Sequence, residues 1–380
     1  MIDAPVRLTS LDAFRGFTIA AMVLVNNPGD WGNLHAQLAH AAWHGWTFTD
    51  TIFPFFLFIG GVAMALSLGR LAAAGADRPQ LLVKLAKRAA LIFLIGFLLN
   101  LIPRFDWGGV RIPGVLQRIA LCTLLAAPLV VYLTWRGQAI AIFVLLALYS
   151  ALMLLAPVPG IGAGVLEPGQ DVGAWIDRTL LEGHLWASSR TWDPEGLLST
   201  LPAVCSLLFG VLAGRLLLST LARVEQVVWL LLAGLACLAL GSTLDAVLMP
   251  INKSLWTPSF CLWMSGWALL AFGACYWLLD AAPSTALRDG AKRLSTPFVI
   301  YGMNALFIFA LSGLVAKMLG FITLTQPDGS QRALGQVLYA PFAALPLDPR
   351  NTSLLYAIAF NACMFAIAWW MWRRRWFVKV

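Results

Sequence analysis

A succession of long stretches without a charged side chain is the feature that most constrains how this chain can fold. A helix needs roughly 20 apolar residues to cross a bilayer. The uncharged stretches lie at 16–29, 51–69, 89–103, 119–135, 137–166, 196–214, 226–244, 254–279, 294–316 and 351–372. The sequence therefore predicts an all-α, polytopic transmembrane helix bundle of about ten spans. Because these stretches use up most of the chain, we expect a single transmembrane domain over residues 1–380.

The composition excludes several classes of protein. Hydrophobic residues make up 60% of the chain and charged residues 12%, about half the charged fraction of an ordinary soluble domain. A soluble globular enzyme, a disordered chain and a nucleic-acid binder are therefore all excluded. The net charge of +8 is interpreted through membrane topology rather than through binding to a polyanion.

The distribution of cations predicts the orientation. With a cytoplasmic N-terminus, most Lys and Arg residues fall on the inside, including the cluster Arg373 to Arg375, as the positive-inside rule requires. Both termini are then cytoplasmic. The segments 28–50, 158–195 and 318–350 lie outside, and the first two contain all four histidines.

Polar side chains occur where the bilayer disfavours them. The first uncharged run is short, so its helix must carry Asp12 or Arg15 into the membrane region, and residues three apart on a helix can form an ion pair. Gln117 and Arg118 follow Pro113 and Gly114 at the start of the fourth span. Arg118 either extends to the outer interface or faces a polar cavity. A structural ion pair is the alternative for Asp12 and Arg15.

The segment between the first two spans is rich in groups that can do chemistry. Asn26 precedes a Pro-Gly turn, and HAAWHGWTFTD then supplies His40, His44 and Asp50. A histidine beside an apolar cavity can act as a base or as a carrier of an acetyl group. Asp50 either orients that imidazole or only caps the second span. The His40–His44 spacing lacks the acidic residue and the third ligand of a zinc motif, so we expect no metal.

Further polar and aromatic residues in the outer segments are weaker candidates. The alternatives to a substrate-binding role are an aromatic belt for the tryptophans and helix capping for the acidic pair. The candidates are Trp43, Asp193, Glu195, Asn252 and Lys253. Asn304, within YGMNALF, is a further polar residue in the ninth span.

Eight motifs in order resemble the heparan-alpha-glucosaminide N-acetyltransferase family. They are LDAFRGFTIAAMVLVNN, HAAWHGWTFTDTIFPFFLFIGG, RIPGVLQRIA, AWIDRTLLEGHLW, TWDPEGLLSTLPAV, NKSLWTPSF, PFVIYGMNAL and RRRWFVKV. The resemblance runs from near residue 8 to the C-terminus. It suggests a short, bacterial form of the family.

The resemblance implies a transmembrane acetyltransferase of the bacterial inner membrane, which moves an acetyl group from cytoplasmic acetyl-CoA to a glucosamine-type amine on the periplasmic side. The family's active-site histidine matches His40, and a family asparagine matches Asn26. We expect Asp50 to orient His40. The polar groups within the spans would bind acetyl-CoA: Asp12, Arg15, Gln117, Arg118 and Asn304. The acceptor would meet His44, Trp43, Asp193, Glu195, Asn252 and Lys253. The resemblance also implies a homodimer.

Two other functions remain open on the sequence. A secondary transporter also has broken helices and charges at membrane depth, although its usual inverted repeat is not found here. An O-acyltransferase of a polysaccharide would use the same histidine with a hydroxyl acceptor. A direct transfer and a two-step route through acetyl-histidine are equally compatible with the residues.

Overall fold

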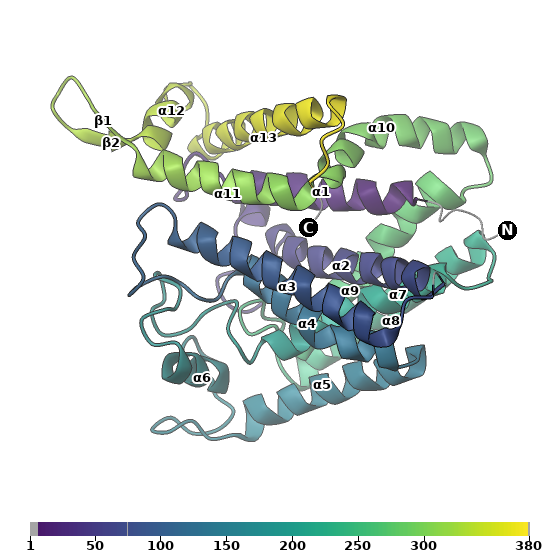
Figure 1. The fold of residues 1–380 in the computed structure, drawn as a ribbon. Coiled ribbons are helices and arrows are strands. Elements are labelled where there is room, and N and C mark those ends of the chain that lie inside the picture. Colours follow the sequence, from purple (N-terminus) through teal and green to yellow (C-terminus); the bar gives the residue numbers. More distant parts are fainter. Residues whose placement is uncertain (1–6, 74, 379–380) are drawn as a thin grey trace.

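The computed structural model describes residues 7–73 and 75–378. Long helices run roughly along one common direction and form a bundle (Figure 1). The long helices are α1 (Thr9–Val25), α2 (Phe48–Ala73), α3 (Arg78–Leu101), α4 (Val115–Tyr132), α5 (Trp135–Leu155), α7 (Thr200–Leu217), α8 (Arg223–Val247), α9 (Pro258–Tyr276), α10 (Thr285–Met303), α11 (Ala305–Phe321) and α13 (Pro349–Arg373). The short elements are η1 (Ala36–Leu38), α6 (Val172–Leu180), the π-helical η2 (Trp277–Ala281), α12 (Leu334–Ala343) and the antiparallel strands β1 (Thr323–Thr325) and β2 (Gln331–Ala333).

The predicted fold class is confirmed, because the helices are long and apolar enough for a multi-pass membrane protein. Within the described residues, seven helical segments meet that test: α2, α4, α5, α7, α8, α9 extended by η2, and α13. The bent pair α10 and α11 is an eighth candidate. The other two of the ten predicted spans correspond to α1, which has only 17 residues, and to α3, whose first half contains Lys84, Lys87 and Arg88. Those two spans stay a prediction.

The run 294–316, predicted as one of the spans, contains a break in the structure. The chain bends by 70° between α10 and α11. Asn304 lies at the break with a non-helical backbone, φ −125° and ψ 32°. Its buried amide donates to the carbonyl of Trp376 at 2.9 Å and accepts from the N–H of Val378 at 2.9 Å. The amide thus ties the segment after α13 into the bend.

Glycines bring several helix pairs into backbone contact. A Cβ atom on Gly16 of α1 would lie 1.6 Å from the carbonyl oxygen of Phe298 in α10. A Cβ on Gly61 of α2 would lie 1.9 Å from the carbonyl oxygen of Leu207 in α7. Only glycine fits at such crossings, which is the usual way in which membrane helices approach closely.

The main apolar core lies in the middle of the bundle, around α2, α7 and α9. Its fully buried side chains include Phe58, Val62, Leu208, Phe260 and Phe272. α5 and α8 border this core and expose much of their apolar surface outward, as helices at the lipid boundary do.

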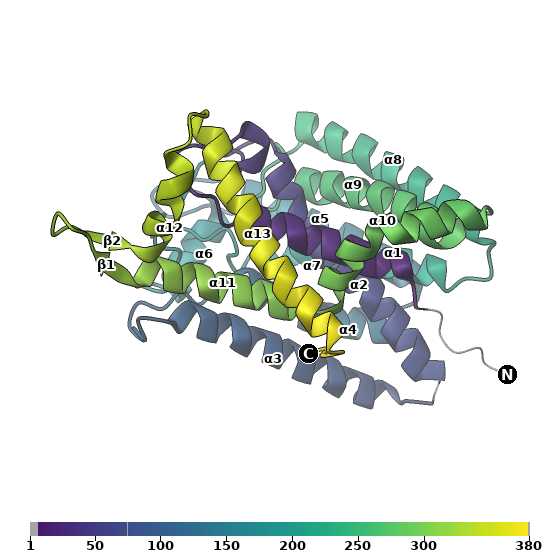
Figure 2. The same cartoon turned by 90° about the horizontal axis from the view of Figure 1, so that it is seen from above.

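The two ends of the bundle differ in character. Short connections join α2 to α3, α4 to α5 and α7 to α8 at one end, while α6, the β-hairpin and α12 lie at the other (Figures 1 and 2). The long connections contact one another there: the indole N–H of Trp43 donates to the carbonyl of Leu166 at 2.9 Å, and the N–H of Asp30 donates to the hydroxyl of Ser353 at 3.0 Å. The segments predicted to share one side of the membrane therefore do share one end of the bundle.

Candidate active site

His40 and Asp50 form the centre of the candidate site. The Nδ1 atom of His40 lies 2.6 Å from Oδ1 of Asp50, in the first turn of α2. The Asp50 side chain is 1% exposed and that of His40 is 50% exposed. A buried carboxylate therefore holds an imidazole that reaches the surface of the site.

Asp50 also organises the loop that carries His40. Its Oδ2 accepts hydrogen bonds from the N–H of Ala41 at 3.1 Å, the N–H of Thr47 at 3.0 Å and the hydroxyl of Thr47 at 3.1 Å. The bond from Thr47 joins the carboxylate to the chain that enters α2. The contacts of Asp50 are therefore compatible with both roles considered for it, orienting an imidazole and stabilising the start of the helix.

The contact with Asp50 assigns the tautomer of a neutral His40. An ionised carboxylate only accepts hydrogen bonds, so Nδ1 of His40 carries the hydrogen. The lone pair is then on Nε2, on the ring edge that Asp50 does not occupy. A histidine held in this way can accept a proton from a reacting group.

Lys253, which is 213 residues away from His40 in the chain, lies against the same imidazole. Its Nζ is 3.0 Å from Nδ1 and 3.2 Å from Nε2 of His40, and 3.6 Å from Oδ1 of Asp50. An atom almost equidistant from the two ring nitrogens cannot lie along the lone pair of either, because those in-plane directions diverge. The ammonium group therefore lies over the face of the ring. Burial lowers the pKa of Lys253, although Asp50 and Glu195 oppose that effect.

The loop before α9 holds Lys253 in place. Asn252 is fully buried, its Oδ1 accepts from the N–H of Leu255 at 2.9 Å, and its Nδ2 lies 3.4 Å from Nδ1 of His44. Asn252 and His44 thus connect this loop to the loop that carries His40. The structure brings both predicted residues to the edge of the site.

A second cluster of charges borders the site. Arg111 donates to Asp193 at 2.8 Å and 2.5 Å and to Glu195 at 2.5 Å. Although burial alone would raise the pKa of Glu195, the nearby Arg111, Arg118 and Lys253 hold it below its ordinary value. The charge of Glu195 therefore couples the Arg111 cluster to Lys253. Sequence reasoning missed Arg111; its only signal is its place in RIPG, two residues before Pro113.

Arg118 faces the protein interior and does not extend to the interface. It is 1% exposed, and it donates to the carbonyl of Gly196 at 2.8 Å and to the hydroxyl of Ser199 at 2.5 Å. Its guanidinium also lies 5.4 Å from the ring centre of Trp256. Its Nε and Nη1, together with Nε2 of the neighbouring Gln117, have no hydrogen-bond partner among the described residues. Buried N–H groups without a protein partner could donate to the oxygen atoms of a bound ligand.

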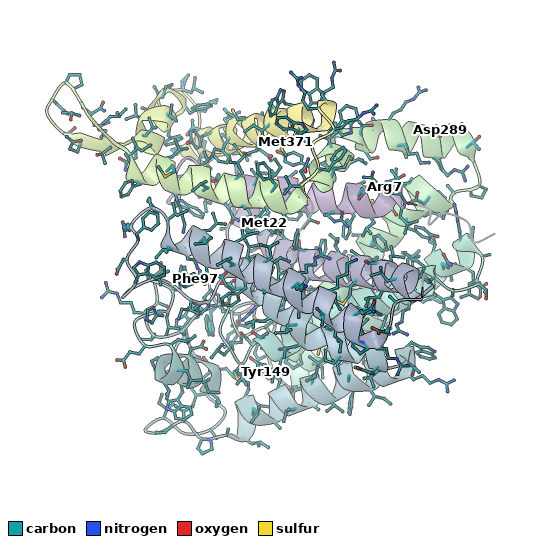
Figure 3. The ribbon with its side chains drawn as sticks, viewed as in Figure 1. Arg7, Met22, Phe97, Tyr149, Asp289 and Met371 are labelled. Carbon is teal, nitrogen blue, oxygen red and sulfur yellow. The ribbon has the colours of Figure 1, made fainter. Side chains whose placement is uncertain are left out.

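Asp12 and Arg15 lie at the opposite end of α1 and form the expected ion pair. The distance from Nη1 of Arg15 to Oδ1 of Asp12 is 3.3 Å, and Arg7 contacts Oδ2 of Asp12 at 2.5 Å. The three side chains line a cavity of about 150 Å³ between α1 and α2. Arg7 lies at the same end of the bundle as Asp289 of α10 (Figure 3). The rise along α1 separates Asp12 from Val25 by about 20 Å.

Three predicted residues stand apart from the His40 cluster. Asn26 is exposed at the C-terminal end of α1, and its neighbour Val25 packs near Ile52 of α2, so it lies at the same end of the bundle as His40. Trp43 packs edge-on against Trp192, with ring centres 5.2 Å apart. The amide of Asn304 binds the C-terminal segment, at Trp376 and Val378, and among the described residues it makes no hydrogen bond with the loop that carries His40.

The fold and the site together define a class: a polytopic α-helical membrane protein with a carboxylate-held histidine among the loops at one end. Residues 7–170 match the family model described as heparan-alpha-glucosaminide N-acetyltransferase, catalytic. Two curated relatives carry the name heparan-alpha-glucosaminide N-acetyltransferase. The one from Homo sapiens is 31% identical over 359 residues, covering 80% of this chain and 52% of the relative. The one from Mus musculus is 28% identical over 357 residues, covering 80% and 53%.

These matches support the assignment of the chain to the heparan-alpha-glucosaminide N-acetyltransferase family. It spans about half the length of the curated relatives that it matches. The family predicted from the eight motifs is thereby confirmed.

Proposed function

We propose that this protein is a transmembrane acetyltransferase. It takes the acetyl group of acetyl-CoA from the cytoplasm and transfers it to the amine of a glucosamine-type sugar on the periplasmic side of a bacterial inner membrane. The observation that carries this proposal is the Asp50–His40–Lys253 cluster at one end of the bundle, with a cation-lined cavity at the other end of α1. The names of the relatives support the transfer of an acetyl group to the amine of a glucosaminide.

We place the phosphate groups of acetyl-CoA at the cation-lined cavity. Phosphate groups are bound by Arg side chains through charge-assisted hydrogen bonds, and Arg7 and Arg15 supply them beside Asp12. The charged nucleotide then stays near the cytoplasm while the thioester reaches toward His40. Gln117 and Arg118 offer buried hydrogen-bond donors to the polar part of acetyl-CoA that joins the nucleotide to the thioester. This arrangement avoids the transport of a charged molecule across the bilayer.

His40 moves the proton in this reaction. The acceptor nitrogen attacks the carbonyl carbon of the thioester, and the bond from carbon to sulfur breaks. The proton that the nitrogen loses passes to Nε2 of His40 and from there to the departing sulfur of CoA. Asp50 holds the imidazole in the required tautomer and stabilises its charged form. A two-step route, in which His40 carries the acetyl group, uses the same contacts.

Lys253 stabilises the negative charge that develops on the carbonyl oxygen. The ammonium group of Lys253 lies 3.0 Å from Nδ1 and 3.2 Å from Nε2 of His40, next to the atoms that would take part in the reaction. A cation placed where negative charge develops is among the largest contributions to such catalysis. Asn26, which matches a family asparagine, lies at the same end of the bundle, and its proposed role is to hold the thioester carbonyl or to stabilise its oxyanion. The acceptor would lie at the edge of this cluster that is bordered by Asp193, Glu195, His44 and Asn252, with Trp43 farther out.

The central test is the variant His40→Ala. We expect it to abolish acetyl transfer from labelled acetyl-CoA to glucosamine while it still inserts into membranes and binds CoA. The matched control is His35→Ala, in the same loop, whose Nε2 contacts Asn351 instead of Asp50. Full activity of His40→Ala would refute the assignment.

A panel of acceptors distinguishes this function from its rivals. Glucosamine, N-acetylglucosamine and muropeptide sugars would be offered to the purified protein with labelled acetyl-CoA. Label on the amine supports N-acetylation, and label on a hydroxyl supports an O-acyltransferase. Sugar flux without acetylation would favour a transporter. Label found only in acetate would exclude both transferases.

The role of Lys253 is tested by separating kcat from KM. Loss of a group that stabilises only the transition state lowers kcat, whereas loss of a group that only binds the acceptor raises KM. We expect Lys253→Met to lower kcat about 100-fold with little change in the KM for the acceptor, and Lys253→Arg to recover part of the loss. A raised KM with unchanged kcat would show that Lys253 only binds the acceptor.

A further inference from the structure

A large apolar cavity lies far from His40, at the end of the bundle with the short connections. Its volume is about 1150 Å³, slightly above the range of roughly 300–1,000 Å³ typical of small-molecule pockets. α7 contributes Phe209, Leu212 and Ala213 to its floor. α5 and α8 form its two walls, and these are helices whose outer faces are exposed and apolar. A ligand that enters between α5 and α8 would come from the hydrocarbon region of a membrane.

The mouth of this cavity carries one cation and one anion. Arg215, in the last turn of α7, is held there by donating to the carbonyls of Val130 at 2.9 Å and Leu133 at 3.1 Å. Glu225 lies in the first turn of α8 and is exposed. Among the described residues, no hydrogen bond or ion pair engages the Glu225 carboxylate. A ligand with both a negative and a positive group would pair with both side chains.

The aromatic residues at the mouth are of the kind found at membrane-interface depth. Trp135 begins α5 and Trp229 lies in the second turn of α8, and both line the cavity. Tryptophan is enriched where the hydrocarbon meets the headgroups. Basic pockets between transmembrane helices on the cytoplasmic side of a membrane also bind lipid headgroups in other proteins.

We propose that this cavity binds one phospholipid whose headgroup carries a phosphate and a primary ammonium, as in phosphatidylethanolamine. The acyl chains fill the apolar space between α5 and α8. The phosphate lies beside Arg215, and the ammonium donates to Glu225. A quaternary ammonium has no N–H to donate, and a headgroup without an amine leaves Glu225 facing a phosphate.

Native mass spectrometry of the detergent-purified protein tests this proposal. The probes are phosphatidylethanolamine, phosphatidylcholine and phosphatidylglycerol with identical acyl chains. We expect one phosphatidylethanolamine to bind at least tenfold more tightly than the other two. Ala233→Trp, which fills the cavity from α8, should abolish this binding. Its control is Ala239→Trp, on an exposed part of the same helix that does not line the cavity.

The variant Glu225→Gln tests the headgroup separately from the acyl chains. It should still bind a lipid but lose the preference for phosphatidylethanolamine over phosphatidylglycerol. Equal lipid binding by the parent protein and Ala233→Trp would overturn the proposal. So would conversion of a dimer into a monomer by Ala233→Trp, because a second copy of the chain would then cover the cavity. Acetyl transfer is not a readout here, so the outcome is independent of the proposed function.

Discussion

At the scale of single residues, the hydrogen bonds and charges around a buried carboxylate decide the direction in which its pKa shifts. Asp50 is buried but receives four hydrogen bonds and a neighbouring ammonium, which together stabilise its negative charge. Asp177, on α6, is buried with much less support: its Oδ1 accepts only the N–H of Leu197 at 2.9 Å. Burial raises the pKa of Asp177 to about 6, against an ordinary value of 3.8, with nearby Asp193 and Asp171 adding to the increase and Arg118 opposing it.

This shift predicts how stability depends on pH. A carboxyl whose pKa is higher in the folded state than in the unfolded state favours folding at low pH. We therefore expect the contribution of Asp177 to fall as pH rises from about 4 to about 6, by about 3 kcal/mol in total. Asp177→Asn should remove that slope and raise the thermal midpoint at pH 7. The measurement is thermal unfolding in detergent between pH 4 and pH 7.

The control for Asp177 is Glu182→Gln, an exposed carboxylate in the same outer segment. It should leave the pH dependence of unfolding unchanged. If Asp177→Asn lowered the midpoint at pH 7, the carboxylate would be stabilising when charged. The assignment of a raised pKa would then be wrong.

At the scale of secondary-structure elements, single glycines determine how closely helices pack. Gly60 and Gly61 are adjacent in α2 but face different surroundings. A Cβ on Gly61 would meet the Leu207 carbonyl oxygen at 1.9 Å, whereas a Cβ on Gly60 would meet nothing within 4 Å. The crossing of α2 and α7 therefore depends on one of two neighbouring glycines.

The two alanine variants at these positions should have opposite effects on stability. Gly61→Ala must push α2 and α7 apart, which costs about 1–3 kcal/mol or more. Gly60→Ala should add about 0.5–1 kcal/mol, because alanine favours a helix and no clash opposes it. Thermal unfolding of both variants in the same detergent measures the difference. Similar midpoints would show that the close approach at Gly61 is absent.

At the scale of the whole molecule, the two ends of the bundle have different compositions and connections. One end holds the short connections, and the other holds α6, the β-hairpin and the loops around His40 (Figure 1). The chemistry proposed above requires that these ends face different compartments. The sidedness of the bundle is therefore a prediction on which the proposed function depends.

Cysteine labelling tests that sidedness. Ser330→Cys, in the β-hairpin, should react with a membrane-impermeant maleimide added to intact bacterial cells that express the protein. Ser284→Cys, just before α10, should react only after the membrane is permeabilised. Most native cysteines are buried, and the parent protein gives the background. Labelling of Ser284→Cys alone in intact cells would invert the predicted orientation.

The amino-acid sequence determined the helical membrane fold, the family and the local pair of His40 and Asp50. Uncharged stretches identify spans because the cost of a charge in hydrocarbon acts on each segment by itself. His40 and Asp50 are only ten residues apart, so one motif contains both. The resemblance of eight ordered motifs likewise needs no coordinates.

Only the tertiary structure decided which distant groups meet. Lys253 reaches the ring of His40 because the loop before α9 packs against the loop before α2, and no local pattern encodes that contact. The structure also turned Arg118 inward, where the sequence left two environments open, and it bent the run 294–316 at Asn304. The physical reason is that hydropathy depends on neighbours in the chain, whereas side-chain pairing and helix breaks depend on packing between segments that are remote in sequence.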